Sequence, residues 1–293
     1  MSDVLVKALG FNNQARIYAV TTTDALNLIG DRLNYFPSAL DALGRVMSMG
    51  AMMGGTLKRE ETVTLRIDGD GQIGRIIVDA NAHGDIRGYA ENPHCHFEYN
   101  DYRLNAKATI GSKGMITVIK DLKLKEPFIG YTPIINGEIA EDFAYYYSVS
   151  EQVSTAISLG VLVDTEGRAV VSGGFMIQLL PNCTEETIDK IEAKVKSLPP
   201  ISEILSSGFT PKDIIQNIAE DANILEETKI NFKCNCSYDK FARGILSLGS
   251  AEIKSMIDED GVADTTCHFC GNTYHFSKEA LTALYEEAKA KGK

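Results

Sequence analysis

The sequence lacks the long hydrophobic runs and the basic charge that characterise membrane proteins and nucleic-acid-binding proteins. No apolar stretch among the 293 residues approaches the roughly twenty that a membrane helix needs, which predicts a soluble protein without a membrane partner. Acidic residues outnumber basic ones by 40 to 29, and the net charge of −11 would repel nucleic-acid phosphates. The first residues, MSDVLVK, also lack the basic start and apolar run of a signal peptide. We therefore expect a cytoplasmic protein with no nucleic-acid partner.

The sequence also lacks the residue patterns of common enzymes. No nucleophile has a plausible base beside it, and no pair of carboxylates lies in apolar surroundings. Gly69, Gly71 and Gly74 form a G-x-G-x-x-G motif. Dinucleotide binding requires a helix after this motif, whereas the residues that follow alternate as a strand. We interpret the glycines as hairpin turns and expect no enzymatic activity.

Two of the six cysteines are isolated in the sequence. Cys95 lies between His94 and His96, and an extended segment would place both imidazoles on one face, so at most half a metal site results. We expect Cys95 to be a buried structural thiol. Cys183 precedes an expected helix and has no partner nearby, so a structural thiol is favoured over an exposed thiol of low pKa.

The other four cysteines form two close pairs near the C-terminus. Cys234 and Cys236 form a C-x-C pair, Cys267 and Cys270 form a C-x-x-C pair, and thirty residues separate the pairs. This pattern predicts a tetrathiolate zinc site with one Zn²⁺ per chain in the reduced state. Each pair could also close as a local disulfide. A static zinc site and a redox switch therefore both remain open, while the missing signal peptide disfavours a secreted disulfide scaffold.

The residues around these cysteines predict a small domain over residues 231–293. Ser237 is placed to begin a helix that Gly249 ends, Ser250 begins a second helix, and Ser277 begins a terminal one. Few large apolar side chains are available for a core, and small cores usually need a metal or disulfides. The region has 8 basic and 9 acidic residues, so it offers no basic patch for DNA. We expect the metal to supply most of its folding free energy.

The first part, residues 1–180, predicts an α+β core domain with antiparallel sheet. Its hydrophobic periods alternate between helix and strand along the whole segment. Strands are expected around 15–21, 62–67, 73–79, 86–90, 108–120, 122–125, 158–163 and 169–180, with helices from Thr23, over about 38–57 and from Gly137. The glycines within 38–57 are poor helix formers, so we expect them to permit close approach of a neighbouring element.

The segment 181–230 predicts a helical linker with little strand character. It has 5 lysines against 10 acidic residues and contains three short amphipathic helices. Isolated helices of this length are unstable in water, so we expect them to dock on the cysteine domain. Their apolar side chains form a candidate client-binding surface: Ile188, Ile191, Val195, Ile214, Ile215 and Ile218.

Stretches along the whole chain carry a resemblance to a known family. They are ALGRVMSMGAMMGG at 42–55, GDGQIGRIIVDANAHGDIRGYAENPH at 69–94, GEIAEDFAYYYSVSEQ at 137–152, and FARGILSLG followed by CHFCGNTYHFS. Together with the two cysteine pairs, they resemble the redox-regulated 33 kDa heat shock chaperones of bacteria. The resemblance implies an ATP-independent holdase, a stress-response chaperone that binds thermally unfolding and oxidatively damaged client proteins.

The same resemblance implies how the activity is regulated. The reduced, zinc-bound form would be inactive, and oxidation to Cys234–Cys236 and Cys267–Cys270 disulfides would release zinc and yield an active homodimer. Our physical hypothesis is that loss of the metal unfolds the cysteine domain and then the linker, which exposes apolar surface. The alternatives are a thiol-disulfide oxidoreductase that uses Cys267 and Cys270, and a zinc-ribbon module that binds a folded partner.

Overall fold

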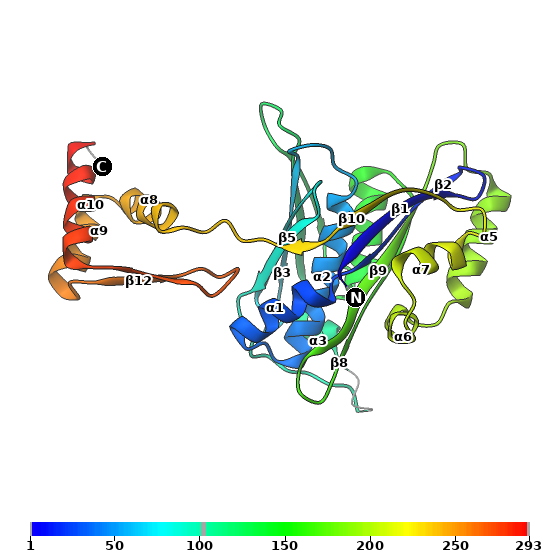
Figure 1. The fold of residues 1–293 in the computed structure, drawn as a ribbon, viewed down its shortest axis with the longest axis horizontal. Helices are drawn as coiled ribbons and strands as arrows, with labels where there is room; N and C mark the ends of the chain where they lie inside the picture. Colours follow the sequence, from blue (N-terminus) through cyan, green and yellow to red (C-terminus); the bar gives the residue numbers. More distant parts are fainter. Residues whose placement is uncertain (1, 101–103, 292–293) are drawn as a thin grey trace. The chain divides into compact units, whose positions relative to one another are not determined.

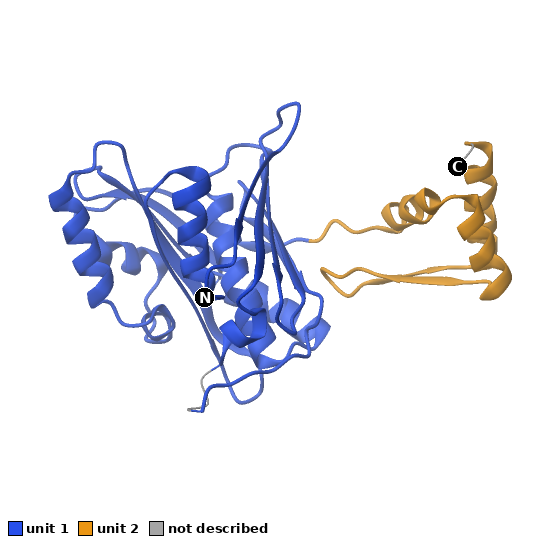
Figure 2. Cartoon of the chain, turned by 180° about the vertical axis from the view of Figure 1, so that it is seen from behind, with its two compact units in different colours: residues 1–233 blue, residues 234–293 orange. Residues whose placement is uncertain are grey.

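The computed structural model describes residues 2–100 and 104–291. The chain divides into two compact units, residues 1–233 and residues 234–293 (Figure 2). We refer to them as unit 1 and unit 2. No helix in the described ranges is both long enough and apolar enough to cross a membrane.

Unit 1 is built on two sheets that are antiparallel except for the last strand added to the second. Sheet A has the strand order β10-β1-β2-β9-β8, and sheet B has the order β11-β5-β4-β3-β6-β7. The strands of sheet A are β1 (Val4–Gly10), β2 (Ala15–Thr21), β8 (Thr155–Val163), β9 (Ala169–Leu179) and β10 (Asn223–Lys229). Those of sheet B are β3 (Thr62–Gly69), β4 (Arg75–Asn81), β5 (Asp85–Ala90), β6 (Gly114–Asp121), β7 (Phe128–Pro133) and β11 (Asn231–Phe232), which pairs parallel with β5.

Helix α2 (Pro37–Gly54) lies between the two sheets and organises the main core (Figure 1). The glycines of this helix let it approach both sheets, as predicted. A Cβ on Gly44 would lie 2.8 Å from Val161 of β8, and one on Gly50 would lie 2.7 Å from Val78 of β4. The remaining helices of this part are α1 (Thr23–Leu33), α3 (Ala106–Ile110), α4 (Ile139–Tyr146) and the π-helical turn η1 (Tyr147–Glu151).

Helices α5 (Glu185–Ser197), α6 (Ile201–Ser206) and α7 (Pro211–Ile218) pack on sheet A. Thr210 caps α7 in a reciprocal capping box with Asp213. The apolar side chains of these helices form a cluster with Ile17, Phe175 and other side chains of sheet A. The expectation that the cysteine domain supports these helices is therefore wrong for the buried side chains, because sheet A buries them.

Three parts of the expected secondary structure need correction. Residues 106–110 form helix α3 instead of the start of a strand, because the Asn105 side chain accepts a hydrogen bond from the backbone N–H of Ala108. The strand that pairs with β6 is 128–133, not 122–125. Strand β10 was not expected within 181–230, because most of its side chains are exposed and its apolar alternation is weak.

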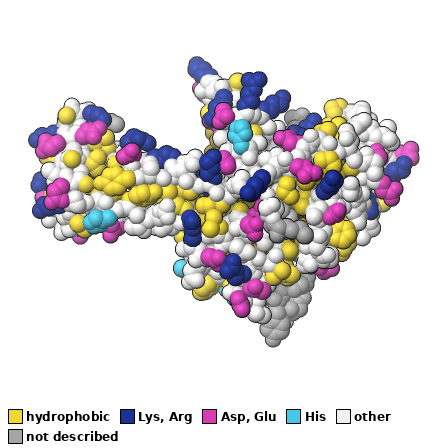
Figure 3. All heavy atoms as spheres, in the orientation of Figure 1, with side chains coloured by type: hydrophobic (Ala, Val, Ile, Leu, Met, Phe, Trp, Pro, Cys, Tyr) yellow, Lys and Arg dark blue, Asp and Glu magenta, His cyan; other side chains and the backbone are white. Residues whose placement is uncertain are grey.

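Unit 2 contains two helices, a β-hairpin and a terminal helix in its described residues. They are α8 (Tyr238–Leu248), α9 (Ser250–Glu259), β12 (Ala263–Thr266), β13 (Thr273–Phe276) and α10 (Lys278–Ala290). Ser237 and Ser277 cap α8 and α10 through their side chains, as predicted. The core of unit 2 is small and consists of Ile245, Leu246, Ile253, Ile257, Phe276, Leu281 and Ala288. On the face drawn in Figure 3, acidic and basic side chains are interspersed over much of the surface.

Candidate metal centre

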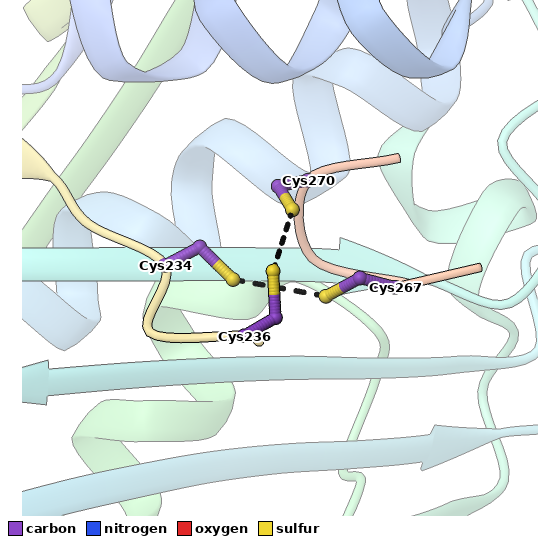
Figure 4. A group of neighbouring side chains, drawn as sticks. All are labelled: Cys234, Cys236, Cys267 and Cys270. Carbon is purple, nitrogen blue, oxygen red and sulfur yellow. Dashed lines mark hydrogen bonds between the residues drawn. The ribbon is translucent and has the colours of Figure 1, made fainter. Parts of the chain in front are cut away.

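The four paired cysteines converge in unit 2 from two separate segments. Cys234 and Cys236 lie between β11 and α8, and Cys267 and Cys270 lie in the turn that joins β12 to β13 (Figure 4). Two hydrogen bonds close this turn: Gly271 donates its backbone N–H to the Cys267 carbonyl at 2.8 Å, and Cys267 donates its N–H to the Asn272 carbonyl at 2.9 Å. Backbone hydrogen bonds of the hairpin turn therefore position the C-x-x-C pair.

The distances between the sulfurs fit a tetrahedral metal site. The Sγ atoms of Cys234 and Cys267 are 3.7 Å apart, and those of Cys236 and Cys270 are 3.4 Å apart. All four sulfurs lie within 4.8 Å of one another. A regular tetrahedron with Zn–S bonds of about 2.3 Å has edges of about 3.8 Å, whereas a disulfide bond is about 2.05 Å long. The arrangement therefore fits four thiolates around Zn²⁺ and is that of free thiols, not disulfides.

The two pairs differ in their surroundings. Cys267 and Cys270 are only 5% and 3% exposed, whereas Cys234 and Cys236 are half-buried. Burial raises the pKa of Cys267 and, together with the neighbouring thiols, raises the pKa of Cys270 to about 12. Burial also acts to raise the pKa of Cys236, but hydrogen bonds from Tyr274 and neighbouring thiols outweigh it and lower the pKa to about 7. Four thiolates in such a small volume need a cation to balance their charge.

Tyr274 is a residue of this site that the sequence analysis did not identify. Its hydroxyl group donates a hydrogen bond to Cys236 Sγ at 3.1 Å, and this contact raises the pKa of Tyr274 to about 12. The ring of Tyr274 also packs against Phe241 of α8, with centroids 5.1 Å apart. The available sequence signal was the alternation of Tyr274 and Phe276, which indicates a strand but not which groups its side chains contact.

Cys95, Cys183, His94 and His96 belong to unit 1 and are not among the clustered cysteines. Cys95 is buried, as expected, and its thiol donates to the Asn92 carbonyl at 3.6 Å, while burial raises its pKa. His96 hydrogen-bonds with Ser38 and Glu98. Burial raises the pKa of Cys183, which argues against a reactive low-pKa thiol there. Within the described part of the chain, the four paired cysteines form the one cluster suited to hold a metal.

The candidate client-binding side chains come together on one side of sheet A. Ile188 and Val195 are partly buried, and the other four are buried in the same cluster. A cavity of about 250 Å³ next to them is lined by Ile188, Ile191, Ile177 and Leu179, among others. These residues are thus close together but largely covered in this state, and their role in binding clients remains a prediction.

The fold and the site together define an α+β protein whose C-terminal unit carries a compact cluster of four cysteines that could bind a metal. The sequence model of the Hsp33 protein family matches residues 3–277. A relative from Geobacillus sp. (strain WCH70), named 33 kDa chaperonin, is 45% identical over 99% of this chain and 100% of its own length. A relative of the same name from Listeria monocytogenes serovar 1/2a is 46% identical, again over 99% of this chain and 100% of its own.

A solved structure agrees with these relatives. The crystal structure of the 33 kDa chaperonin (heat shock protein 33 homolog) from Thermotoga maritima has a TM-score of 0.92 and 31% sequence identity, covering 99% of this chain and 100% of that chain. The chain belongs to the Hsp33 family. It is a chaperone that binds client proteins and is not an enzyme, and the family resemblance found in the sequence is confirmed.

Proposed function

We propose that this chaperone is an ATP-independent holdase that is dormant when reduced and metal-bound and becomes active when its paired cysteines are oxidised. The observation that carries the proposal is the cluster of four Sγ atoms within 4.8 Å of one another in a unit with a small apolar core. Oxidation of these sulfurs would release the metal and so remove the main contribution to the stability of unit 2. The proposal requires a compartment that keeps thiols reduced, as the cytosol does.

The metal would dominate the stability of unit 2. When bound, zinc would contribute on the order of 10–16 kcal/mol to folding, which is as large as the whole stability of most domains, about 5–15 kcal/mol. The core of unit 2 contains one fully buried aromatic ring, that of Phe276, among its described residues. A core of this size leaves little stability once the four sulfurs are no longer bound to a common ion.

Oxidation removes the sulfurs as ligands. In each pair, one thiolate attacks hydrogen peroxide, the O–O bond breaks, and a sulfenic acid and hydroxide form. The second thiolate then attacks the sulfenic sulfur, an S–S bond forms, and a second hydroxide leaves. Two thiolates thus lose two electrons, and one peroxide is reduced. We propose the pairing of neighbours, Cys234 with Cys236 and Cys267 with Cys270, as the family resemblance implies.

The backbone supplies a route from the metal centre to the helices on sheet A. Cys234 directly follows Lys233, whose backbone N–H donates to the Ile86 carbonyl at 3.0 Å and so fixes the end of β11 on sheet B. Strand β11 in turn follows β10, the edge strand of sheet A. Asp221 precedes β10 and accepts hydrogen bonds from the N–H groups of Phe11 and Asn12. Unfolding that begins at Cys234 can therefore spread backwards through β11 and β10 to α7.

Loosening of α5 to α7 would uncover the proposed client surface. Ile214, Ile215 and Ile218 are almost completely buried against sheet A, and Ile191 is 4% exposed. Their release would expose both the helix stripes and the apolar face of the sheet beneath them, a contiguous surface suited to unfolding clients. We further propose that the oxidised form is a homodimer, because a newly exposed apolar face of this kind also favours association.

The geometry favours this function over that of a thiol-disulfide oxidoreductase. Thiol oxidoreductases place a C-x-x-C pair at a helix N-terminus, where the reactive thiol has a lowered pKa. Here the pair lies in the β12–β13 turn, and burial raises the pKa of Cys267 and Cys270. A zinc-ribbon module that binds a folded partner would act without oxidation. The test below distinguishes this alternative from the proposed holdase.

The test measures metal, thiols and activity in one oxidation series. Zinc content, free thiols and suppression of aggregation of an unrelated unfolding protein are followed as peroxide is added at mild heat. We expect loss of one zinc and four thiols per chain to coincide with the onset of suppression. A variant with Cys95→Ser and Cys183→Ser should behave identically. Suppression that begins while one zinc per chain is still bound would contradict the proposal.

A further inference from the structure

The four sulfurs of the metal centre do not receive the same hydrogen bonds. Cys236 accepts a hydrogen bond from the Tyr274 hydroxyl at 3.1 Å. The other half-buried cysteine, Cys234, has no hydroxyl donor of this kind among the described residues; its Sγ lies 3.7 Å from that of Cys267. The two half-buried thiolates, which an external reagent can reach most easily, are thus distinguished by a single hydroxyl group.

The position of this hydroxyl is fixed from several sides. Tyr274 pairs with Thr265 across the β12–β13 hairpin, and the Thr265 hydroxyl donates to the Tyr274 carbonyl at 3.4 Å. Its ring packs at 5.1 Å against Phe241, which lies on the helix that begins directly after the C-x-C pair. Tyr274 therefore belongs to the segment that carries one cysteine pair and donates its hydrogen bond to the other pair.

We propose that Tyr274 is a positioning residue that retains Cys236 as a metal ligand and lowers its reactivity toward electrophiles. A thiolate that accepts a hydrogen bond from a neutral hydroxyl shares part of its charge with the donor, and such charge-assisted bonds are stronger than neutral ones. To attack an electrophile, the sulfur lone pair must leave this interaction. This inference rests on the proposed metal site and adds a determinant of how readily that site is lost.

The first test compares the two half-buried thiols within the same molecule. Zinc-loaded protein is treated with iodoacetamide, whose carbon is attacked by Sγ; a C–S bond forms, the C–I bond breaks, and iodide leaves with the electron pair. Mass spectrometry of the peptides gives the alkylation rates of Cys236 and Cys234. In the unmodified chain we expect Cys236 to react more slowly than Cys234. An equal or faster rate at Cys236 would overturn the proposal without any variant being needed.

The second test removes the hydroxyl and keeps the ring. Tyr274→Phe should raise the alkylation rate of Cys236 relative to Cys234 on the order of tenfold, as expected for a lost hydrogen bond to a charged group. It should also weaken zinc retention about tenfold in competition with a chromophoric chelator, the lower end of effects seen when a ligand's hydrogen-bond partner is removed. Tyr238→Phe is the matched control, because the Tyr238 ring stacks on Phe276 at 4.3 Å, whereas the hydroxyl that donates to Cys236 is that of Tyr274.

A third variant separates the hydrogen bond from packing. Phe241→Leu disturbs the packing of the Tyr274 ring and leaves its hydroxyl in place. We expect Phe241→Leu to change the ratio of Cys236 to Cys234 alkylation less than Tyr274→Phe does, because the β12–β13 pairing still holds Tyr274 and its hydroxyl is kept. If it reproduces the effect of Tyr274→Phe, packing explains the result and the proposal is wrong.

Cobalt provides a spectroscopic measurement that does not depend on reactivity. With Co²⁺ in place of zinc, Tyr274→Phe should move the sulfur-to-metal charge-transfer band to longer wavelength, because one sulfur becomes more electron-rich. An unmoved band together with an unchanged alkylation ratio would overturn this inference and leave the metal site intact. Failure of the unmodified chain to bind either metal would instead overturn the proposed function itself.

Discussion

The two units reach stability by different means. Unit 1 places α2 between two sheets and buries large apolar side chains in the core there, including Leu43 and Met47 of α2 and Phe143 of α4. Unit 2 has few buried apolar side chains among its described residues, and four cysteines lie together at one end of its β-hairpin. Apolar packing is less sensitive to oxidants than thiolate ligation is. If the proposed function is right, the chain joins a scaffold held by apolar packing to a unit whose stability depends on the oxidation state of its cysteines.

Removal of the metal should cause the largest difference in stability between the two units. Chelation of zinc from the reduced protein removes on the order of 10 kcal/mol or more from unit 2 and none from unit 1. We expect amide hydrogens of β12, β13 and α10 to lose their protection from exchange, while those of α2 keep theirs. Hydrogen exchange with mass spectrometry measures both. Continued protection of α10 in the chelated protein would show that apolar packing alone holds unit 2.

Equivalent cavities in the two units should have different consequences. Phe143 and Phe276 are both fully buried, and truncation of either to alanine should cost about 3–5 kcal/mol. Phe143→Ala should lower the urea midpoint of unit 1 equally with and without zinc. Phe276→Ala should instead lower the apparent zinc affinity of unit 2 by on the order of a hundredfold or more, because folding and metal binding are linked there.

Chelator competition and urea titration, each performed on both variants, provide the comparison. A zinc affinity that is unchanged in Phe276→Ala would mean that unit 2 folds independently of its metal.

Mutations in the helices on sheet A should have effects of intermediate size on stability and activation. Ile215 is fully buried against the sheet, and Ile215→Ala should destabilise α7 by about 2–5 kcal/mol. We expect this variant to suppress client aggregation at lower peroxide concentrations than the unmodified chain, since less of the unfolding remains to be driven by metal loss. Ile188→Ala, at a half-buried position, is the control and should shift the threshold less.

Equal thresholds for Ile215→Ala and the unmodified chain would place client binding elsewhere on the protein. Aggregation assays across a peroxide series, with zinc content measured in parallel, distinguish this outcome from a general loss of stability.

Much of the fold could be predicted because local chemistry dictated it. The caps Ser237 and Ser277 are short-range signals, and each begins a helix where the sequence indicated. That the four cysteines lie together could be predicted from the two close pairs, although their role as metal ligands stays a prediction. The α+β class followed from hydrophobic periods in the same way.

The missed features depend on partners distant in sequence. Strand β10 has mostly exposed side chains, and it is a strand because β1, more than two hundred residues earlier, offers its free edge. The contact of Tyr274 with Cys236 spans 38 residues and depends on how the hairpin meets α8. The helices α5 to α7 were correctly predicted, but their support was misassigned, because an apolar stripe does not specify which surface covers it.

A mutation of Lys233, at the end of unit 1, should have the smallest effect on stability, and the effect should be confined to the amides of β11. Lys233 directly precedes Cys234, the first cysteine of the cluster, and its Nζ lies 2.8 Å from the Asp85 carboxylate. Both groups are partly exposed to solvent, so the pair should contribute less than about 1 kcal/mol. Burial acts to raise the pKa of Asp85, but its hydrogen bonds to Lys233 and Asn81 and its attraction to the lysine lower it below its ordinary value. Because the folded-state pKa is depressed, the stabilisation is present above the ordinary carboxyl pKa and is lost only as the pH falls through the lowered value.

Lys233→Met should therefore raise the exchange rates of the Asn231 and Lys233 amides, which donate to Gly84 and Ile86, by up to about fivefold between pH 6 and 8. High salt should bring the unmodified chain toward the variant, because it screens the pair. Lys190→Met breaks an exposed pair on α5 and should leave these amides unchanged. If Lys233→Met changes neither these amides nor the peroxide concentration at which β10 loses protection, the ion pair has no part in docking β11, and only the backbone hydrogen bonds connect the metal centre to sheet B.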